Sequence, residues 1–158
     1  MFNVGDKVVY PMHGAGIIEA IEEREILGQR QQYYVMRLPI GEMKVMIPTR
    51  NVDGIGLREV IDHGEVCKVF EILRSQKTKM STNWNRRYRA NLEKIKSGDI
   101  FEVAEVVRNL ILRDKEKGLS TGERKMLDNA KQILISELVL AQGIDETEAR
   151  DLLEDLFR

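Results

Sequence analysis

Cysteine is nearly absent from this 158-residue chain, since Cys67 is the only one. A single cysteine cannot form an intramolecular disulfide, and its setting in "EVCKVFEIL" predicts a small buried thiol. Histidine is also scarce: neither His13 nor His63 has a second histidine or a cysteine at the spacing of a metal site. We therefore expect no metal and no other cofactor.

Long apolar runs are missing as well. The longest, such as "ILISELVLA", is far shorter than the roughly 20 residues of a membrane span. The start, "MFNVGDKVVY", has neither the basic beginning nor the continuous apolar segment of a secretory signal. We expect a folded protein of the cytosol that makes no contact with a membrane.

The sequence lacks the common motifs of enzymes. "HGAG" and "GIG" do not extend to a dinucleotide fingerprint or to a phosphate loop, so we interpret them as turns. No nucleophile, base and orienting group can be assembled from neighbouring positions, and we find no small-molecule substrate site. The prediction is a protein that is not an enzyme. Catalytic groups that meet only in the folded chain stay an open alternative.

The first 50 or so residues have the pattern of short strands. "KVVYP", "GIIEAIEERE", "QQYYVMRL" and "MKVMIP" mix β-branched and aromatic residues with polar ones, and glycine-containing turns separate them. This spacing predicts a small, strongly bent antiparallel sheet or barrel.

Beyond the irregular segment "TRNVDGIGLRE" the apolar period changes from two to about 3.6 residues, as in amphipathic helices. Another helix is expected from about Asn83 to Lys96. The sequence thus predicts an α+β protein, with a β module over residues 1–55 and a compact all-α bundle of about five helices over 56–158. Four pairs match a helix N-cap followed three residues later by an acid: Asp62 with Glu65, Asp99 with Glu102, Ser120 with Glu123, and Asp145 with Glu148.

Charge is unevenly distributed, although the formal net charge is only −1. Residues 74–96 hold eight basic side chains and one acidic one, a net charge of +7. Residues 97–158 hold nine basic and fourteen acidic ones, a net charge of −5. A local basic patch on a nearly neutral protein can attract phosphate without making the whole molecule a polycation.

The only tryptophan, Trp84, lies in this basic segment, within "STNWNRRYR". At about 100° per residue it shares a helical stripe with Tyr88, Leu92 and Ile95, which favours a ring that faces the core. Its position in the predicted first turn favours the opposite, because free backbone N–H groups and the positive end of the helix dipole attract a phosphate there. The residues alone leave open a core anchor, an exposed ring beside nucleic acid, or a basic helix that binds an acidic protein.

The order of the motifs resembles the CarD/CdnL family of bacterial transcription regulators. The similarity is carried by "NWNRRYRANLEKIKSGD", "EVAEVVRNL", "RDKEKGLSTGE" and "AKQILISEL", and at the start by "VGDKVVYPMHGAGIIEAIE" and "VMIP". It runs nearly from end to end and in the expected order. The resemblance implies a Tudor-like module over 1–55, similar to the polymerase-interaction domain of transcription-repair coupling factors, and a helical DNA-contacting domain over 56–158.

The resemblance also implies a function. Members of the family bind the β subunit of bacterial RNA polymerase in the primary-sigma holoenzyme and stabilise the promoter open complex. They place a tryptophan against the minor groove at the upstream edge of the bubble, largely independently of sequence. By position that residue is Trp84, with Arg86, Arg87 and Arg89 as its basic neighbours.

For the polymerase surface, the resemblance points to Arg24 in "EEREI" and to Met46 and Pro48 in "VMIP". Some relatives have a basic residue where Met46 stands, so here that contact would be apolar. The residues alone leave open an alternative in which Arg24 is an ordinary exposed strand residue and Met46 a core residue of the barrel. The alternative function is an adaptor whose basic helix binds an acidic protein partner and never touches DNA.

Overall fold

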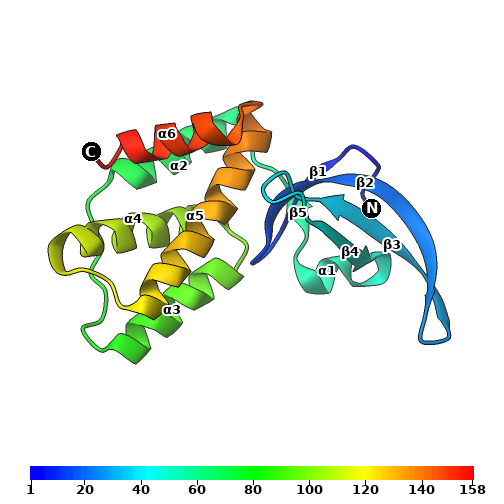
Figure 1. Ribbon diagram of the computed structural model, residues 1–158, viewed down its shortest axis with the longest axis horizontal. Coiled ribbons are helices and arrows are strands. Elements are labelled where there is room, and N and C mark those ends of the chain that lie inside the picture. Colours follow the sequence, from blue (N-terminus) through cyan, green and yellow to red (C-terminus); the bar gives the residue numbers. More distant parts are fainter.

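A computed structural model describes residues 1–158. Its first part is a five-stranded antiparallel sheet with the strand order β4-β3-β2-β1-β5 (Figure 1). A short 3₁₀ helix, η1 (Thr49–Asn51), and one turn of α-helix, α1 (Val52–Ile55), follow the fourth strand. The strands are β1 (Lys7–Tyr10), β2 (Gly14–Ile26), β3 (Gln29–Arg37), β4 (Lys44–Pro48) and β5 (Arg58–Glu59).

The hairpin of β2 and β3 is much longer than the other strands and extends away from the rest of the molecule (Figure 1). A bulge between Ile18 and Ala20 interrupts the pairing, and such an extra residue bends a strand. Leu27 and Gly28 form the tip with φ of 55° and 79°, the positive values of the two-residue turn that suits a twisted hairpin.

One face of the sheet holds the core of the β module. Tyr34 is its largest buried side chain, and Val52 and Ile55 of the η1–α1 segment pack against this core. The other buried residues are Val8, Ile18, Met36, Leu38, Ile47 and Leu57. The fifth strand lies beyond residue 55, because Arg58 and Glu59 pair with Val9 and Val8 of β1. The sheet thus extends past residue 55, and the division of the chain into domains at residue 55 stays a prediction.

Five helices make up the second part of the chain, so the predicted α+β architecture is confirmed. They are α2 (His63–Arg74), α3 (Trp84–Lys96), α4 (Ile100–Lys117), α5 (Thr121–Gln142) and α6 (Glu146–Asp155). All four predicted N-caps are confirmed, because Asp62, Asp99, Ser120 and Asp145 each accept a hydrogen bond from a backbone N–H of the first turn. None of the helices is long and apolar enough to cross a membrane.

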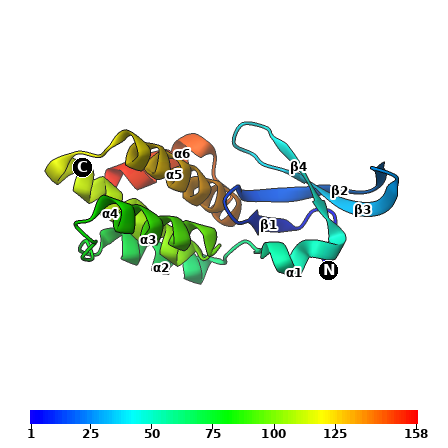
Figure 2. The same cartoon turned by 90° about the horizontal axis from the view of Figure 1, so that it is seen from below.

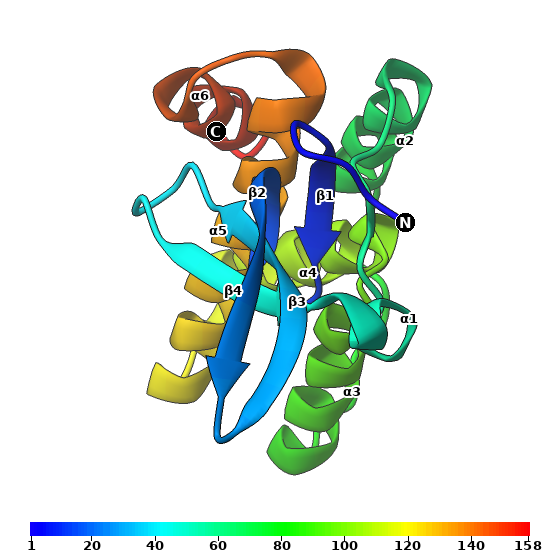
Figure 3. The same cartoon turned by 90° about the vertical axis from the view of Figure 1, so that its right-hand side faces the viewer.

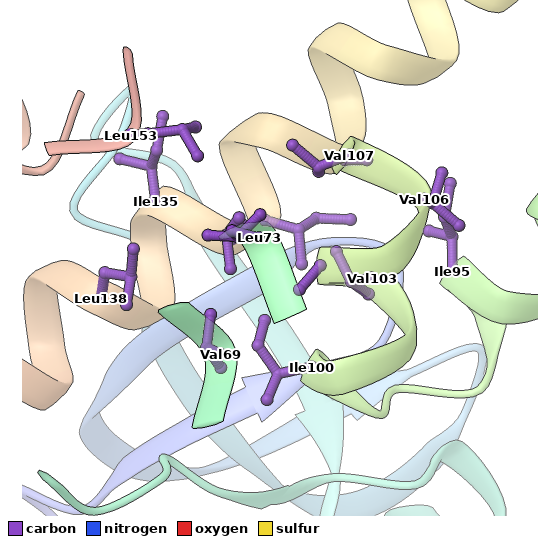
Figure 4. Packing of buried hydrophobic residues seen from close by; sticks show 14 of the residues in the cluster. Val69, Leu73, Ile95, Ile100, Val103, Val106, Val107, Ile135, Leu138 and Leu153 are labelled. Carbon is purple, nitrogen blue, oxygen red and sulfur yellow. The ribbon is translucent and has the colours of Figure 1, made fainter. Parts of the chain in front are cut away.

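Helix α5 is the axis of the bundle and contacts α2, α3, α4, α6 and also β2. Its apolar side chains belong to one continuous core, to which α2, α3, α4 and α6 also contribute (Figure 4). Among its members are Val69 and Leu73 of α2, Ile95 of α3, Ile100, Val103 and Val107 of α4, Ile135 and Leu138 of α5, and Leu153 of α6.

Cys67 was expected to be buried, and this prediction is wrong, since its side chain is exposed. The buried residues of α2 are Val66, Val69 and Leu73, whose spacing of three and four residues places them on one face. Cys67 is one residue beyond Val66, so it is rotated by about 100° away from that face.

The sheet and the bundle meet at α5, which lies against β2 (Figure 2). Ser136 Oγ accepts a hydrogen bond of 2.8 Å from Ala15 N, and the neighbouring Gly14 leaves no room for a side chain, because a Cβ there would lie 2.6 Å from Ser136 Oγ. Lys7 Nζ donates to the carbonyl oxygen of Leu140 at 3.1 Å. Seen from the β module, the strands stand directly in front of the bundle helices (Figure 3).

Candidate nucleic-acid interface

Trp84 is the first residue of α3, at the end of that helix remote from the sheet (Figure 1). The helix begins there because Asn83 caps it: its side-chain oxygen accepts from Arg86 N at 3.1 Å. The residue is 41% exposed, so Trp84 is neither a core anchor nor a free side chain. It lies at the edge of the bundle.

The exposed ring is held by neighbours from two helices. The ring of Tyr88, one turn further along α3, stacks on the indole with centroids 4.9 Å apart and an interplanar angle of 18°. The indole Nε1–H donates to Ser120 Oγ at 3.0 Å, across the gap to the start of α5. The predicted stripe continues inward through half-buried Tyr88 and Leu92 to fully buried Ile95.

Arg86 and Arg89 lie in the first two turns of α3, the helix that begins at Trp84, and carry free positive charges. Both side chains are exposed, and neither forms an ion pair within 4.0 Å. Other cations of the segment are partly neutralised, because Lys77 pairs with Glu116 and Lys94 with Glu105, each at 2.7 Å. The uncompensated charge on α3 is therefore concentrated at the end that carries Trp84, with Lys96 at its other end.

Arg87 was expected as a basic neighbour of Trp84 that faces DNA, but the structure buries it. Its side chain is only 4% exposed, and its Nε and Nη2 donate to the two carboxylate oxygens of Glu123 at 2.8 and 3.2 Å. Its Nη1 donates to the carbonyl oxygens of Ser81 and Thr82 at 3.1 and 3.4 Å. Every donor direction of Arg87 points into the protein, so we leave it out of the surface that faces a nucleic acid.

The electrostatics of Glu123 follow from this pair. Burial alone raises the pKa of its carboxyl, but the hydrogen bonds and the positive charge of Arg87, together with the Ser120 hydroxyl, outweigh burial. The pKa of Glu123 therefore lies below its usual range. Glu123 stays ionised at neutral pH and holds Arg87 inside the bundle.

The three residues expected to face polymerase lie on one face of the sheet. Between β4 and β3, Met46 pairs with Val35 and Pro48 with Tyr33. Between β2 and β3, Glu22 pairs with Tyr33 and Arg24 with Gln31. Cross-strand partners share a face, and residues two apart on one strand do too, so Arg24, Met46 and Pro48 point to the same side.

Exposure differs among these three residues. Met46 is 37% exposed, so the alternative of a core position does not hold, whereas Pro48 is half-buried at the end of β4. Arg24 is exposed as expected and pairs with Glu22 at 2.7 Å. Because β4 is an edge strand, the side of the module that carries Met46 and Pro48 is open to a partner.

Comparisons with known families cover both parts of the chain. Residues 68–154 match the family described as "CarD, C-terminal domain", and residues 2–61 match the "CarD-like/TRCF RID domain". The chain belongs to the CarD family. Two solved structures cover the β module only: the solution NMR structure of the 72-residue N-terminal domain of Myxococcus xanthus CarD, and CdnLNt from the same organism.

The similarities to individual CarD-type proteins are extensive in sequence. The chain is 49% identical over 150 residues to YdeB of Bacillus subtilis (strain 168), whose name marks it as a candidate transcription factor, and the match covers 95% of this chain and 98% of YdeB. Identity to the Myxococcus CarD domain is 37%, covering 37% of this chain and 79% of that one, with a TM-score of 0.33. For CdnLNt the identity is 48%, covering 39% and 86%, with a TM-score of 0.34.

Sequence reasoning missed the residues that hold Trp84 in this CarD-family protein. Ser120 and Glu123 were recognised as a helix start, which the spacing of a hydroxyl and an acid three residues on reveals. Nothing in the sequence links Ser120 to Trp84, or Glu123 to Arg87, because each pair is separated by 36 positions.

Proposed function

We propose that this CarD-family protein is a transcription regulator that binds the β subunit of bacterial RNA polymerase and stabilises the promoter open complex. Trp84 would lie against the minor groove at the upstream edge of the bubble. The observation that carries the proposal is the half-exposed Trp84 at the head of α3, with the exposed and unpaired Arg86 and Arg89 in the first two turns of the same helix. The role is one of binding, without catalysis, and its place is the cytoplasm, at the nucleoid.

The proposed DNA contact combines two physical effects. Arg86 and Arg89 neutralise phosphates and release counterions, which gives affinity without sequence preference. The indole supplies a flat apolar surface beside a base step that is already opened or kinked, as apolar wedges do in the minor groove. Together they favour melted DNA over duplex DNA, largely independently of sequence.

The polymerase contact is assigned to the β module. Three observations support it: the match of residues 2–61 to the CarD-like/TRCF RID domain, the common face of Arg24, Met46 and Pro48, and the open edge at β4. Where Met46 stands, the contact is apolar. The partner is polymerase in its primary-sigma holoenzyme, held at a promoter.

The two contacts reinforce each other because they are held on one chain, whose β module packs against α5 of the bundle. The β2–β3 hairpin and the start of α3 lie toward opposite ends of the long axis of the molecule (Figure 1). Binding of the β module raises the effective concentration of DNA at Trp84, so a patch too weak to bind alone becomes occupied. If the bound protein favours the open form tenfold, the equilibrium shifts by about 1.4 kcal/mol.

Polymerase capture by the full-length chain tests the first contact. We expect Arg24→Glu to weaken capture of the β subunit at least tenfold, because the reversal adds a fourth acid to Glu22, Glu23 and Glu25. Arg30→Glu is the matched control, since Arg30 is exposed on the same hairpin and makes only a loose 3.6 Å ion pair. Equal capture by the wild type and Arg24→Glu would contradict the assigned polymerase face.

Titration with DNA that contains a bubble tests the second contact. Trp84 is the only tryptophan, so its fluorescence reports on this site alone. We expect quenching at low salt by bubble DNA and less by duplex DNA of the same length. Unchanged emission with DNA, together with quenching by an acidic protein, would instead favour the adaptor function.

A further inference from the structure

The indole of Trp84 is held by contacts on several sides, although the residue is partly exposed. Tyr88 covers one face of the ring, and the ring lies against Gly122, where a Cβ would stand 3.4 Å from Trp84 Cζ2. The Nε1–H donor is used by Ser120 Oγ at 3.0 Å. Three neighbours from α3 and α5 therefore fix the ring, although 41% of the residue is exposed.

The hydroxyl group of Ser120 makes three hydrogen bonds. Besides accepting from Trp84, its hydroxyl oxygen accepts from Glu123 N at 3.2 Å, and its hydroxyl donates to Glu123 Oε1 at 3.3 Å. A serine hydroxyl offers one donor and two acceptor positions, and all three are occupied here. Capping of α5 needs only the contact with Glu123 N, so the bond to Trp84 is an additional use of the same group.

A second set of contacts holds the backbone that leads into α3, just before Trp84. Glu123 pairs with Arg87, and Arg87 donates to the carbonyl oxygens of Ser81 and Thr82, in the segment that leads into α3. A closed circuit thus runs from this segment through Arg87 and Glu123 to Ser120, and from Ser120 back to the ring of Trp84. Because Arg87 and Glu123 are almost fully buried, this circuit joins the starts of α3 and α5 firmly.

We propose that Tyr88 and Ser120 are positioning residues, which set the orientation of the Trp84 ring before DNA is bound, and that the Arg87–Glu123 pair holds the backbone they act on. This inference rests on the proposed function. Fixing a flexible side chain on binding costs affinity, and a ring that is already fixed avoids that cost. Loss of these contacts should therefore weaken the action of Trp84 about twofold to threefold, without abolishing it.

Variants of Ser120 separate this role from simple capping. Ser120→Gly removes the acceptor for the indole while a glycine still tolerates the N-cap position, at a cost of only a few tenths of a kcal/mol relative to serine. Ser120→Thr keeps the hydroxyl and is the conservative rescue. Asp145→Gly makes an equivalent change at the N-cap of α6, which lies at another helix start and has no contact with Trp84.

The first measurement uses the free full-length protein. Time-resolved fluorescence anisotropy of Trp84 should show a larger amplitude of fast ring motion in Ser120→Gly than in the wild type. Ser120→Thr and Asp145→Gly should match the wild type. Equal fast amplitudes in Ser120→Gly and the wild type would overturn the proposal, since the ring would then be fixed without Ser120.

The second measurement is the lifetime of the promoter open complex with polymerase. We expect Ser120→Gly to shorten the lifetime about twofold to threefold relative to the wild type, to a value still above that of Trp84→Ala, with Ser120→Thr and Asp145→Gly unchanged. If Trp84→Ala shortens the lifetime and Ser120→Gly does not, the positioning role is wrong and the proposed function stands. If Trp84→Ala has no effect, the proposed function fails, and the positioning role with it.

Discussion

Arg58 and Glu137 form a two-point ion pair between β5 and α5, with Nη1–Oε2 and Nη2–Oε1 distances of 2.8 and 2.7 Å. Glu137 is fully buried, and its Oε2 also accepts from Ile61 N at 2.9 Å. Arg58 reaches further, because its Nε donates to the carbonyl oxygen of Gly98 at 2.8 Å, at the end of α3. One pair therefore ties the last strand of the sheet to two helices of the bundle.

Glu137→Ala should destabilise the whole protein, because it leaves Arg58 and the N–H of Ile61 without their acceptor in the interface. Removing one partner of a buried pair costs about 3–5 kcal/mol of unfolding free energy. Urea unfolding followed by circular dichroism measures it. Glu22→Ala is the control, since the exposed pair of Glu22 with Arg24 should contribute about 0–1 kcal/mol. Similar losses in the two variants would show that the pair does not hold the interface.

The Glu123–Arg87 pair predicts a specific dependence of stability on pH. The pKa of Glu123 is lowered in the folded protein, so this group stabilises the fold at pH values above the ordinary glutamate pKa of about 4.3. The contribution is lost as the pH falls through the lower folded-state pKa. Wild type should therefore exceed Glu123→Gln in unfolding free energy most at neutral pH, and the difference should shrink below about pH 4. A difference that is constant from pH 7 to pH 3 would contradict the charge pairing.

Tyr88→Leu should loosen Trp84 while keeping an apolar side chain in the stripe. Stacked aromatic pairs contribute about 0.5–1.5 kcal/mol beyond their buried area, so a loss of stability in this range is expected. The near-ultraviolet circular dichroism of Trp84 should also weaken. Tyr10→Leu, which disturbs a ring pair in the β module instead, is the control for loss of an aromatic contact. An unchanged tryptophan spectrum in Tyr88→Leu would mean that the stack does not order the ring.

Arg86 and Arg89 should account for part of the salt dependence of DNA binding. Each phosphate contact contributes about 0.9 to the slope of log affinity against log salt concentration. Arg86→Ala and Arg89→Ala are each expected to reduce the slope by about 1 with bubble DNA, at any sequence. Arg30→Ala, on the hairpin of the β module, should leave it unchanged. If neither arginine alters the slope, the basic face of α3 does not contact phosphate.

Local sequence patterns predicted much of this structure. The change in the period of apolar residues distinguished the strands from the helices. Asp62, Ser120 and Asp145 marked helix starts, because an N-cap hydrogen bond involves only residues of the first turn. The stripe that begins at Trp84 was also visible, because it depends only on the pitch of one helix. The first-turn position favoured an exposed Trp84, but the stripe favoured a buried one, and the residues alone did not decide between them.

Long-range pairings were not predictable in this way. Arg87 and Arg86 look alike in the sequence, and only the arrival of Glu123 on another helix makes Arg87 an interior residue. Met46 has the alternating pattern of a core residue, but the core lies on the opposite face of β4, where Ile47 is buried. In both cases, the packing of distant elements decides the environment of the residue.

The lifetime of the promoter open complex, measured with polymerase holoenzyme after addition of a competitor, tests the central claim most directly. Wild-type protein should lengthen the lifetime about tenfold, and Trp84→Ala should remove most of that gain. Leu152→Ala is the matched control, because Leu152 of α6 is 45% exposed, similar to Trp84, but lies on a different helix. Equal lifetimes with the wild type and Trp84→Ala would contradict the account, whereas a loss confined to Trp84→Ala is the result it predicts.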